Sequence, residues 1–186
     1  DPGAVSKLQI LAPGEVALPG SVDGKDMGYA PSVSTAGARF LFTVRAVDDN
    51  WNMVPSVNNL PVTVGVRGDI YADFTGGANL TVMNGFAVKE VMLKRAQTGG
   101  NYAVIEATAA ALTSGLFSPA TRGIGVLHST PTHLQVLLPG QTEEPGSVLG
   151  RTGGVYVSTA GAAFPVTVRV TDDYWNVCAD TSATVN

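Results

Sequence analysis

The stretch that decides the fold is VSTAGARFLFTVRAVDDNWN, residues 33–52, because it returns as VSTAGAAFPVTVRVTDDYWN, residues 157–176, with 14 of 20 positions identical. Residues 8–24 likewise match residues 134–150, with 10 of 17 positions identical. The offset between copies is 126 in the earlier match and 124 in the later one, which indicates a two-residue deletion near the position of Tyr29. Similarity at a fixed period is the mark of a duplicated structural unit.

The period of about 126 residues sets the domain organisation. We expect residues 1–131 to form one complete unit and residues 132–186 to form the first half of a second unit. Half a unit would leave an open core face and unpaired strand edges. Three explanations are open: the sequence is a window from a longer tandem array, a strand of another chain completes the sheet, or residues 131–186 are poorly ordered.

Within the repeated stretch, the hydrophobic pattern has the two-residue period of a half-buried strand. Phe40, Phe42 and Val44 alternate with Leu41, Thr43 and Arg45. Dipeptides typical of turns separate this stretch from the other strand candidates. These candidates are residues 7–11, 60–66, 78–83, 87–95, 101–107 and 123–128, then about 134–138, 162–171 and 177–185. The pattern predicts an all-β fold, an immunoglobulin-like antiparallel β-sandwich in tandem with an incomplete second copy.

Composition narrows the function classes. Apolar residues make up 45% of the 186 residues, which is enough for a core, and only 14% are charged. A net charge of −4 gives no basic surface for nucleic acid, and no apolar run is long enough to span a membrane. Neither a Gly-x-Ser-x-Gly elbow, a phosphate-binding glycine loop nor a His-Glu-x-x-His motif is found, so we expect no enzyme.

The string Val47-Asp48-Asp49-Asn50-Trp51-Asn52-Met53-Val54 resembles the strand-turn signature of bacterial immunoglobulin-like repeats, as in invasin- and intimin-like adhesins. The Leu-Gln-x-Leu-x-Pro-Gly opening and the Thr-Ala-Gly-x-x-Phe strand are similar to tandem repeats of very large secreted bacterial proteins. The chain departs from the invasin type where Trp51 replaces Gly and where the Pro/Gly-rich loop 12–32 lengthens the unit. The resemblance implies an extracellular or cell-surface structural role, as a stalk, adhesin rod or fibre component, with neighbouring copies of the same repeat as partners.

The duplicated Asp-Asp-x-Trp-Asn turn is the candidate for chemistry. It supplies Asp48, Asp49, Asn52, Asp172, Asp173 and Asn176. Carboxylate, amide and carbonyl oxygens are calcium ligands, and each turn offers about half of the six to eight that calcium needs. The alternative is turn geometry, because Asp and Asn side chains bind their own backbone and Asn tolerates positive φ.

The turn is also expected to lie at a joint between units. The first strand of a sandwich leaves its N-terminal end and the next long strand returns there. The turn after that strand should therefore face the preceding unit, and the loop 12–32 between the two strands should face the following one. Glu15, Asp23 or Asp26 would then approach Asp172 and Asp173, and such like charges would need a cation between them. This is the hypothesis of a calcium-stiffened joint.

Two further features suggest a binding module for a glycan or a host receptor, the alternative to a structural role. Trp51 and Trp175 could stack on sugars, or each could pack over one end of the core. Arg67-Gly68-Asp69 has the sequence of the integrin-binding tripeptide, or it is a simple turn.

Overall fold

The computed structural model describes residues 1–97, 100–109 and 123–179, and in these residues the chain is all-β. The strands are β1 (Lys7–Leu11), β2 (Ser34–Thr35), β3 (Arg39–Val47), β4 (Leu60–Arg67), β5 (Asp73–Phe74), β6 (Asn79–Val82), β7 (Phe86–Met92), β8 (Val104–Thr108), β9 (Val126–Leu127), β10 (His133–Leu137), β11 (Thr142–Glu143), β12 (Arg151–Thr152) and β13 (Thr167–Thr171). This part of the chain contains no helix with the length and apolar character needed to cross a lipid bilayer.

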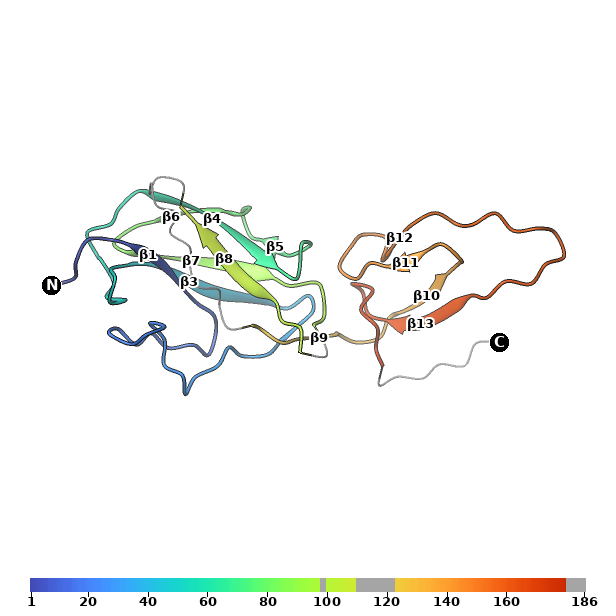
Figure 1. Cartoon of the computed structure of the whole chain (residues 1–186), viewed down its shortest axis with the longest axis horizontal. Helices are drawn as coiled ribbons and strands as arrows, with labels where there is room; N and C mark the ends of the chain where they lie inside the picture. Colours follow the sequence, from blue (N-terminus) through green and yellow to red (C-terminus); the bar gives the residue numbers. More distant parts are fainter. Residues whose placement is uncertain (98–99, 110–122, 180–186) are drawn as a thin grey trace.

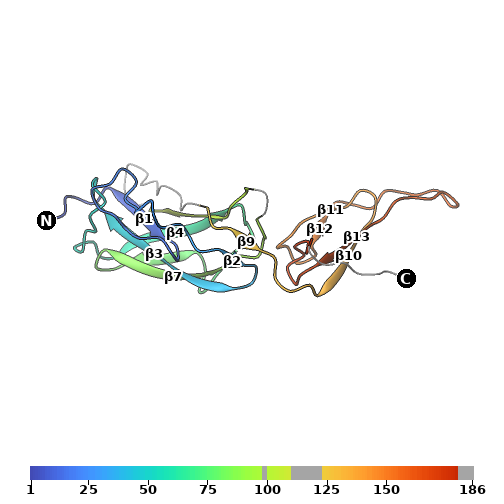
Figure 2. The same ribbon diagram turned by 90° about the horizontal axis from the view of Figure 1, so that it is seen from below.

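Residues 1–131, here called the N-terminal segment, contain two main sheets. One has the strand order β1-β3-β7-β5 and the other has the order β6-β4-β8, and every neighbouring pair in them is antiparallel. The short strands β2 and β9 pair in parallel. Residues 132–186 are called the C-terminal segment, and its described residues, 132–179, lie beyond the end of these sheets, so the described part of the molecule is elongated (Figures 1 and 2).

A single hydrophobic core lies between the two sheets. Phe42 and Val44 of β3 are fully buried on the alternating face that the sequence predicts, and Val62 and Val64 of β4 lie among the same cluster. Burying a side chain of this size stabilises the fold by roughly 1.5–3 kcal/mol. All the fully packed members of the core come from the N-terminal segment. The predicted β-sandwich character is therefore confirmed for this segment.

Every observed strand of four or more residues overlaps a predicted one, whereas the two-residue strands β2, β5, β11 and β12 were not predicted. The first strand has the predicted bounds, Lys7–Leu11, whereas the predicted strand 123–128 is reduced to Val126–Leu127. Ile124 still forms an isolated bridge with Ala103. The predicted strand 101–107 begins later, at Val104.

The C-terminal segment repeats the first hairpin of the N-terminal segment. Leu134 pairs with Val170 as Leu8 pairs with Ala46, and the whole β10–β13 register follows β1–β3. Strand β13 spans only Thr167–Thr171, shorter than predicted, because β3 extends its pairing along β7 and no such partner is present among the described C-terminal residues. Most of the predicted strand 177–185 lies outside the described residues.

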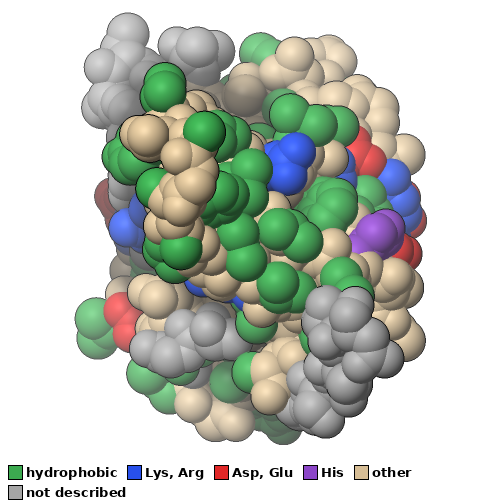
Figure 3. Space-filling view, turned by 90° about the vertical axis from the view of Figure 1, so that its right-hand side faces the viewer, with side chains coloured by type: hydrophobic (Ala, Val, Ile, Leu, Met, Phe, Trp, Pro, Cys, Tyr) green, Lys and Arg blue, Asp and Glu red, His purple; other side chains and the backbone are tan. Residues whose placement is uncertain are grey.

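The apolar face of this second hairpin is open. Leu134, Val136, Val166 and Val168 are 41–51% exposed, whereas their counterparts Leu8, Ile10, Phe42 and Val44 are at most 1% exposed. The space-filling view from the C-terminal end shows hydrophobic side chains gathered on the surface (Figure 3). The difference arises because the second sheet that covers these positions in the N-terminal segment has no counterpart in the described C-terminal residues.

Candidate functional site: two Asp-Asn turns and a joint

The first turn, Asp48–Asn52, follows β3 and is organised around the Asp48 carboxylate. Its Oδ1 accepts hydrogen bonds from the backbone N–H groups of Asn50 and Asn52, both at 2.9 Å. Its Oδ2 accepts from the N–H of Gly3 at 2.9 Å, and Asn52 Nδ2 donates to both oxygens. The Gly3 N–H, followed by the Asn52 side chain, lowers the pKa of Asp48 to about 2. The carboxylate thus acts as the structural centre of the turn.

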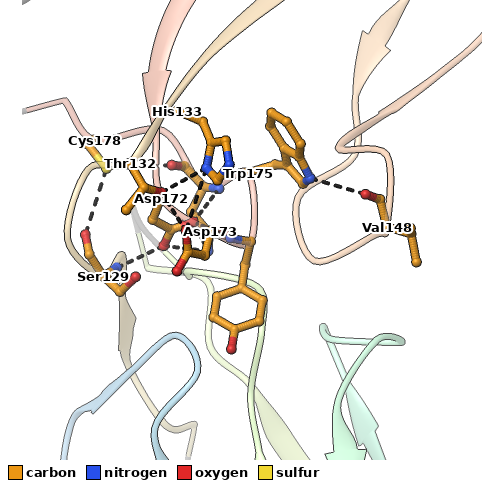
Figure 4. A network of polar contacts seen from close by, with 10 residues as sticks. Ser129, Thr132, His133, Val148, Asp172, Asp173, Trp175 and Cys178 are labelled. Atoms are coloured by element: carbon orange, nitrogen blue, oxygen red, sulfur yellow. Dashed lines mark hydrogen bonds and ion pairs between the residues drawn. The ribbon is translucent and has the colours of Figure 1, made fainter.

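The second turn, Asp172–Asn176, repeats this geometry. Asp172 Oδ1 accepts from the N–H groups of Tyr174 and Asn176 at 2.9 Å, and Oδ2 accepts from Ser129 N–H at 2.8 Å (Figure 4). Ser129 occupies the place of Gly3 at the offset of 126. Trp51 and Trp175 have φ values of 65° and 64°, so both turns use a left-handed residue at the same position.

The predicted calcium ligands are divided between two places. Asp48, Asp49 and Asn52 lie at the outer end of the N-terminal segment, and Asp172, Asp173 and Asn176 lie where the two segments meet. Among the described residues, no group of three or more acidic, His or Cys side chains is placed to hold a metal ion. Asp173 Oδ1 accepts from Thr132 Oγ1 at 2.7 Å. The contacts of the Asp48 and Asp172 carboxylates are hydrogen bonds within each turn and one from a distant backbone N–H, that of Gly3 or Ser129.

Each Trp holds the Pro/Gly-rich loop of its own segment. Trp51 is 6% exposed, its Nε1 donates to the Val22 carbonyl at 3.2 Å, and Lys7 Nζ lies 4.1 Å from the ring centroid. Trp175 Nε1 donates to the Val148 carbonyl at 3.3 Å in the same way. These contacts fix a loop, and neither Trp belongs to the hydrophobic core cluster, over one end of which the second interpretation places them.

Asn176 joins the two segments. Its Oδ1 accepts from the backbone N–H of Ala96 at 2.7 Å, and its Nδ2 donates to the Lys94 carbonyl at 2.8 Å. The side chain is 1% exposed, so this pair of bonds is shielded from water. The side-chain amide of Asn176 thereby provides a hydrogen-bond partner for one backbone N–H and one backbone carbonyl in the segment just after β7. The second turn therefore lies against residues of the N-terminal segment.

Tyr174 and Tyr71 add side-chain contacts to this joint. Tyr174 packs against the hydrophobic core of the N-terminal segment, and its hydroxyl donates to Met92 Sδ at 3.7 Å. Tyr71 Oη donates to Glu144 Oε1 at 2.5 Å, which raises the pKa of Tyr71. We call the surface formed by Gly37, Tyr71, Met92, Lys94 and Ala96 the joint end of the N-terminal segment.

The expectation that loop 12–32 supplies acidic groups to the joint is wrong. The N–H of Gly20 donates to the Asn50 carbonyl at 2.7 Å, and Val22 meets Trp51, so this part of the loop lies at the opposite end. The Glu15 carboxylate pairs with Lys25 at 2.8 Å. The loop folds back because its backbone groups find partners in the first turn.

The Arg67-Gly68-Asp69 tripeptide begins at the last residue of β4 and continues into a turn that supports the joint end. Asp69 is 1% exposed, and its carboxylate accepts from the backbone N–H groups of Tyr71, Lys94 and Arg95. Arg67 is exposed and pairs with Glu106 at 3.0 Å. The tripeptide thus presents its arginine to solvent but not its carboxylate.

Sequence reasoning missed the receiving side of the joint, including Gly37, Lys94 and Ala96. Lys94 and Ala96 act through backbone atoms, which leave no side-chain signature. Comparisons with known proteins add no further constraint: no protein-family model matches the chain, and neither the curated proteins nor the solved structures include a match.

Proposed function

We propose that this chain is a structural repeat segment of a bacterial surface or secreted protein, part of a stalk, adhesin rod or fibre. In this proposal its immunoglobulin-like units are joined end to end through direct protein contacts. The function is mechanical: each unit is a stiff sandwich, and each joint fixes the direction of the next unit.

The observation that carries the proposal is the contact of Asn176 with the backbone of Lys94 and Ala96. A turn present in both copies of the repeat is used in the second copy to bind the opposite end of the first. Contact between the two ends of one repeated unit is a heterologous interface, which generates an open array when its rotation does not close into a ring.

Strand order supports the immunoglobulin-like part of the proposal. When strands of four or more residues in the N-terminal segment are counted, the first, second and fifth form one sheet, and the third pairs with the sixth in the other. Immunoglobulin domains likewise have strands A, B and E in one sheet and C and F in the other. The fourth counted strand, β6, pairs with β4 in the second sheet, whereas strand D of a constant-type domain lies in the sheet of A, B and E.

The open face of the second hairpin supports assembly with neighbouring copies. Its four exposed aliphatic side chains occupy positions that are fully covered in the N-terminal segment. A sheet face of this kind is stable in water only when another sheet or strand covers it. The partners implied are further strands of the same repeat, in sequence or supplied by another chain.

Small-angle scattering combined with sedimentation over a concentration series tests the proposal. We expect an elongated particle at low concentration, and a reduced length or a flexible profile when Asn176→Ala and Tyr174→Ala break the joint. Growth of a linear polymer with concentration would point to strand completion between chains. A compact particle, or one whose profile is unchanged by the double variant, would overturn the proposal.

A further inference from the structure

The first turn has the conformation of the second, but among the described residues no segment equivalent to Lys94–Ala96 contacts its Asn52 side chain. Asn52 Nδ2 donates to Asp48, as Asn176 Nδ2 donates to Asp172. In the described residues, nothing donates to Asn52 Oδ1, the atom equivalent to the one that accepts from Ala96 in the joint. Asn50 and Asp49 beside it are exposed.

The surroundings of the two turns match as closely as the turns themselves. Gly3 N–H binds Asp48 Oδ2 at 2.9 Å where Ser129 N–H binds Asp172 Oδ2 at 2.8 Å. Gly20 N–H binds the Asn50 carbonyl at 2.7 Å, and Gly146 N–H binds the Tyr174 carbonyl at the same distance. The first turn is therefore held, before any docking, in the shape that the second turn has when docked. Such preorganisation lowers the entropic cost of binding.

We infer that the first turn is a docking site for the joint end of another copy of residues 1–131. In that contact, Asn52 Oδ1 accepts from the Ala96 N–H of the other copy, and Asn52 Nδ2 donates to its Lys94 carbonyl. The occupant is a copy whose joint end is not already covered by its own second turn. The inference rests on the proposed function and names the partner surface of this outer end.

Two side chains that make contacts in the joint at the second turn have no equivalent at the first turn, and this difference affects the relative strength of the two joints. Asn50 stands where Tyr174 packs into the core, and Leu18 stands where Glu144 accepts from Tyr71. The joint at the first turn keeps the paired amide contact but lacks the tyrosine ring and the second hydrogen bond. It is consequently the weaker joint, and Asn50→Tyr is expected to strengthen it.

An extended chain tests the inference. In this chain a leading copy, residues 1–131, is joined directly to a trailing copy, residues 6–186. Ser6 of the trailing copy then follows Pro131 of the leading copy, as Thr132 follows Pro131 in the protein. Segmental ligation places the isotope label in the leading copy alone. The measurement is amide hydrogen exchange at Ala96 of that copy. We expect exchange about tenfold slower than in the same chain carrying Asn52→Ala, the factor for one net hydrogen bond, and slower still with Asn50→Tyr.

A second sample carries the label in the trailing copy instead. In this sample, slow exchange of the Val44 and Ile105 amides establishes that the trailing copy stays folded with Asn52→Ala. If the Ala96 amide of the leading copy exchanged at the same rate in the chain with Asn52 and in the chain with Asn52→Ala, the inferred docking site would be overturned. If the trailing Ala96, which faces Asn176, stayed protected in that case, the proposed function would survive. Loss of protection at both Ala96 amides would overturn both proposals.

Discussion

Tyr174 of the C-terminal segment lies directly against Gly37 of the N-terminal segment. A Cβ atom at Gly37 would be 2.4 Å from Tyr174 Cε2, closer than real side-chain contacts permit. Gly37 also has a φ of +85°, a conformation that favours glycine. The absence of a side chain at this position therefore lets the ring reach the core, so a single glycine controls the fit of the joint.

Gly37→Ala should open the joint. The added methyl group displaces the Tyr174 ring, and the adjoining Asn176–Ala96 hydrogen bond is lost with it, so exchange of the Ala96 amide should accelerate about tenfold or more. Gly161 is the matched control, because it is the counterpart of Gly37, has a φ of +84°, and a Cβ atom there would meet nothing within 4 Å. Equal exchange rates in the two variants would contradict this assignment.

Gly24→Ala should destabilise the N-terminal segment more than Gly20→Ala. Both glycines have positive φ, so each substitution costs about 1–2 kcal/mol in backbone strain. A Cβ at Gly24 would also be 2.3 Å from the Trp51 ring, whereas a Cβ at Gly20 meets nothing within 4 Å. The clash should add about 1–3 kcal/mol, measured by urea denaturation. Similar losses in both variants would show that Trp51 does not pack as described.

Asp48 should make stability depend on pH in acid. Its pKa in the folded protein is about 2, below the value of 3.8 for a free carboxyl, so the ionised form favours folding. This contribution is complete above about pH 4 and is lost as the pH falls through 2. Urea denaturation between pH 2 and 6 should therefore show a shallower decline for Asp48→Asn. Identical curves for Asp48→Asn and the unsubstituted chain would refute the assignment.

Calcium should leave the joint unchanged. The Asp172 oxygens already accept hydrogen bonds from three backbone N–H groups and from Asn176 Nδ2, and a cation there would compete with those donors. Scattering profiles with calcium and with a chelator should superimpose. A chelator-dependent change in particle length would instead restore the hypothesis of a calcium-stiffened joint.

The two copies offer a direct comparison of a covered and an open sheet face. Val44→Ala should cost about 2 kcal/mol, because it removes fully buried methyl groups. Val168→Ala, at the equivalent position, should cost well under half of that, because its side chain is 41% exposed. Thermal unfolding distinguishes the two variants. A large loss for Val168→Ala would mean that another chain covers this face in solution.

The sequence predicts the elements whose signal is local and repeated. The alternation through Phe42 and Val44 places β3 and its buried face correctly. The duplicated turn draws attention to Asp48 and Asp172, but it leaves calcium binding and turn geometry as alternatives. The path of loop 12–32 was not predictable, because it depends on backbone contacts such as that of Gly20 with Asn50. The receiving backbone at Lys94 and Ala96 has no counterpart in the described C-terminal residues, so the duplication itself could not reveal it.

The central claim is that Asn176 and Tyr174 fix the C-terminal segment on the joint end of the N-terminal segment. Residual dipolar couplings measured separately for backbone amides in residues 1–97 and 132–179 test it most directly. We predict that one alignment tensor fits both sets, and that Asn176→Ala together with Tyr174→Ala separates them. Two different tensors in the unsubstituted chain would contradict the claim.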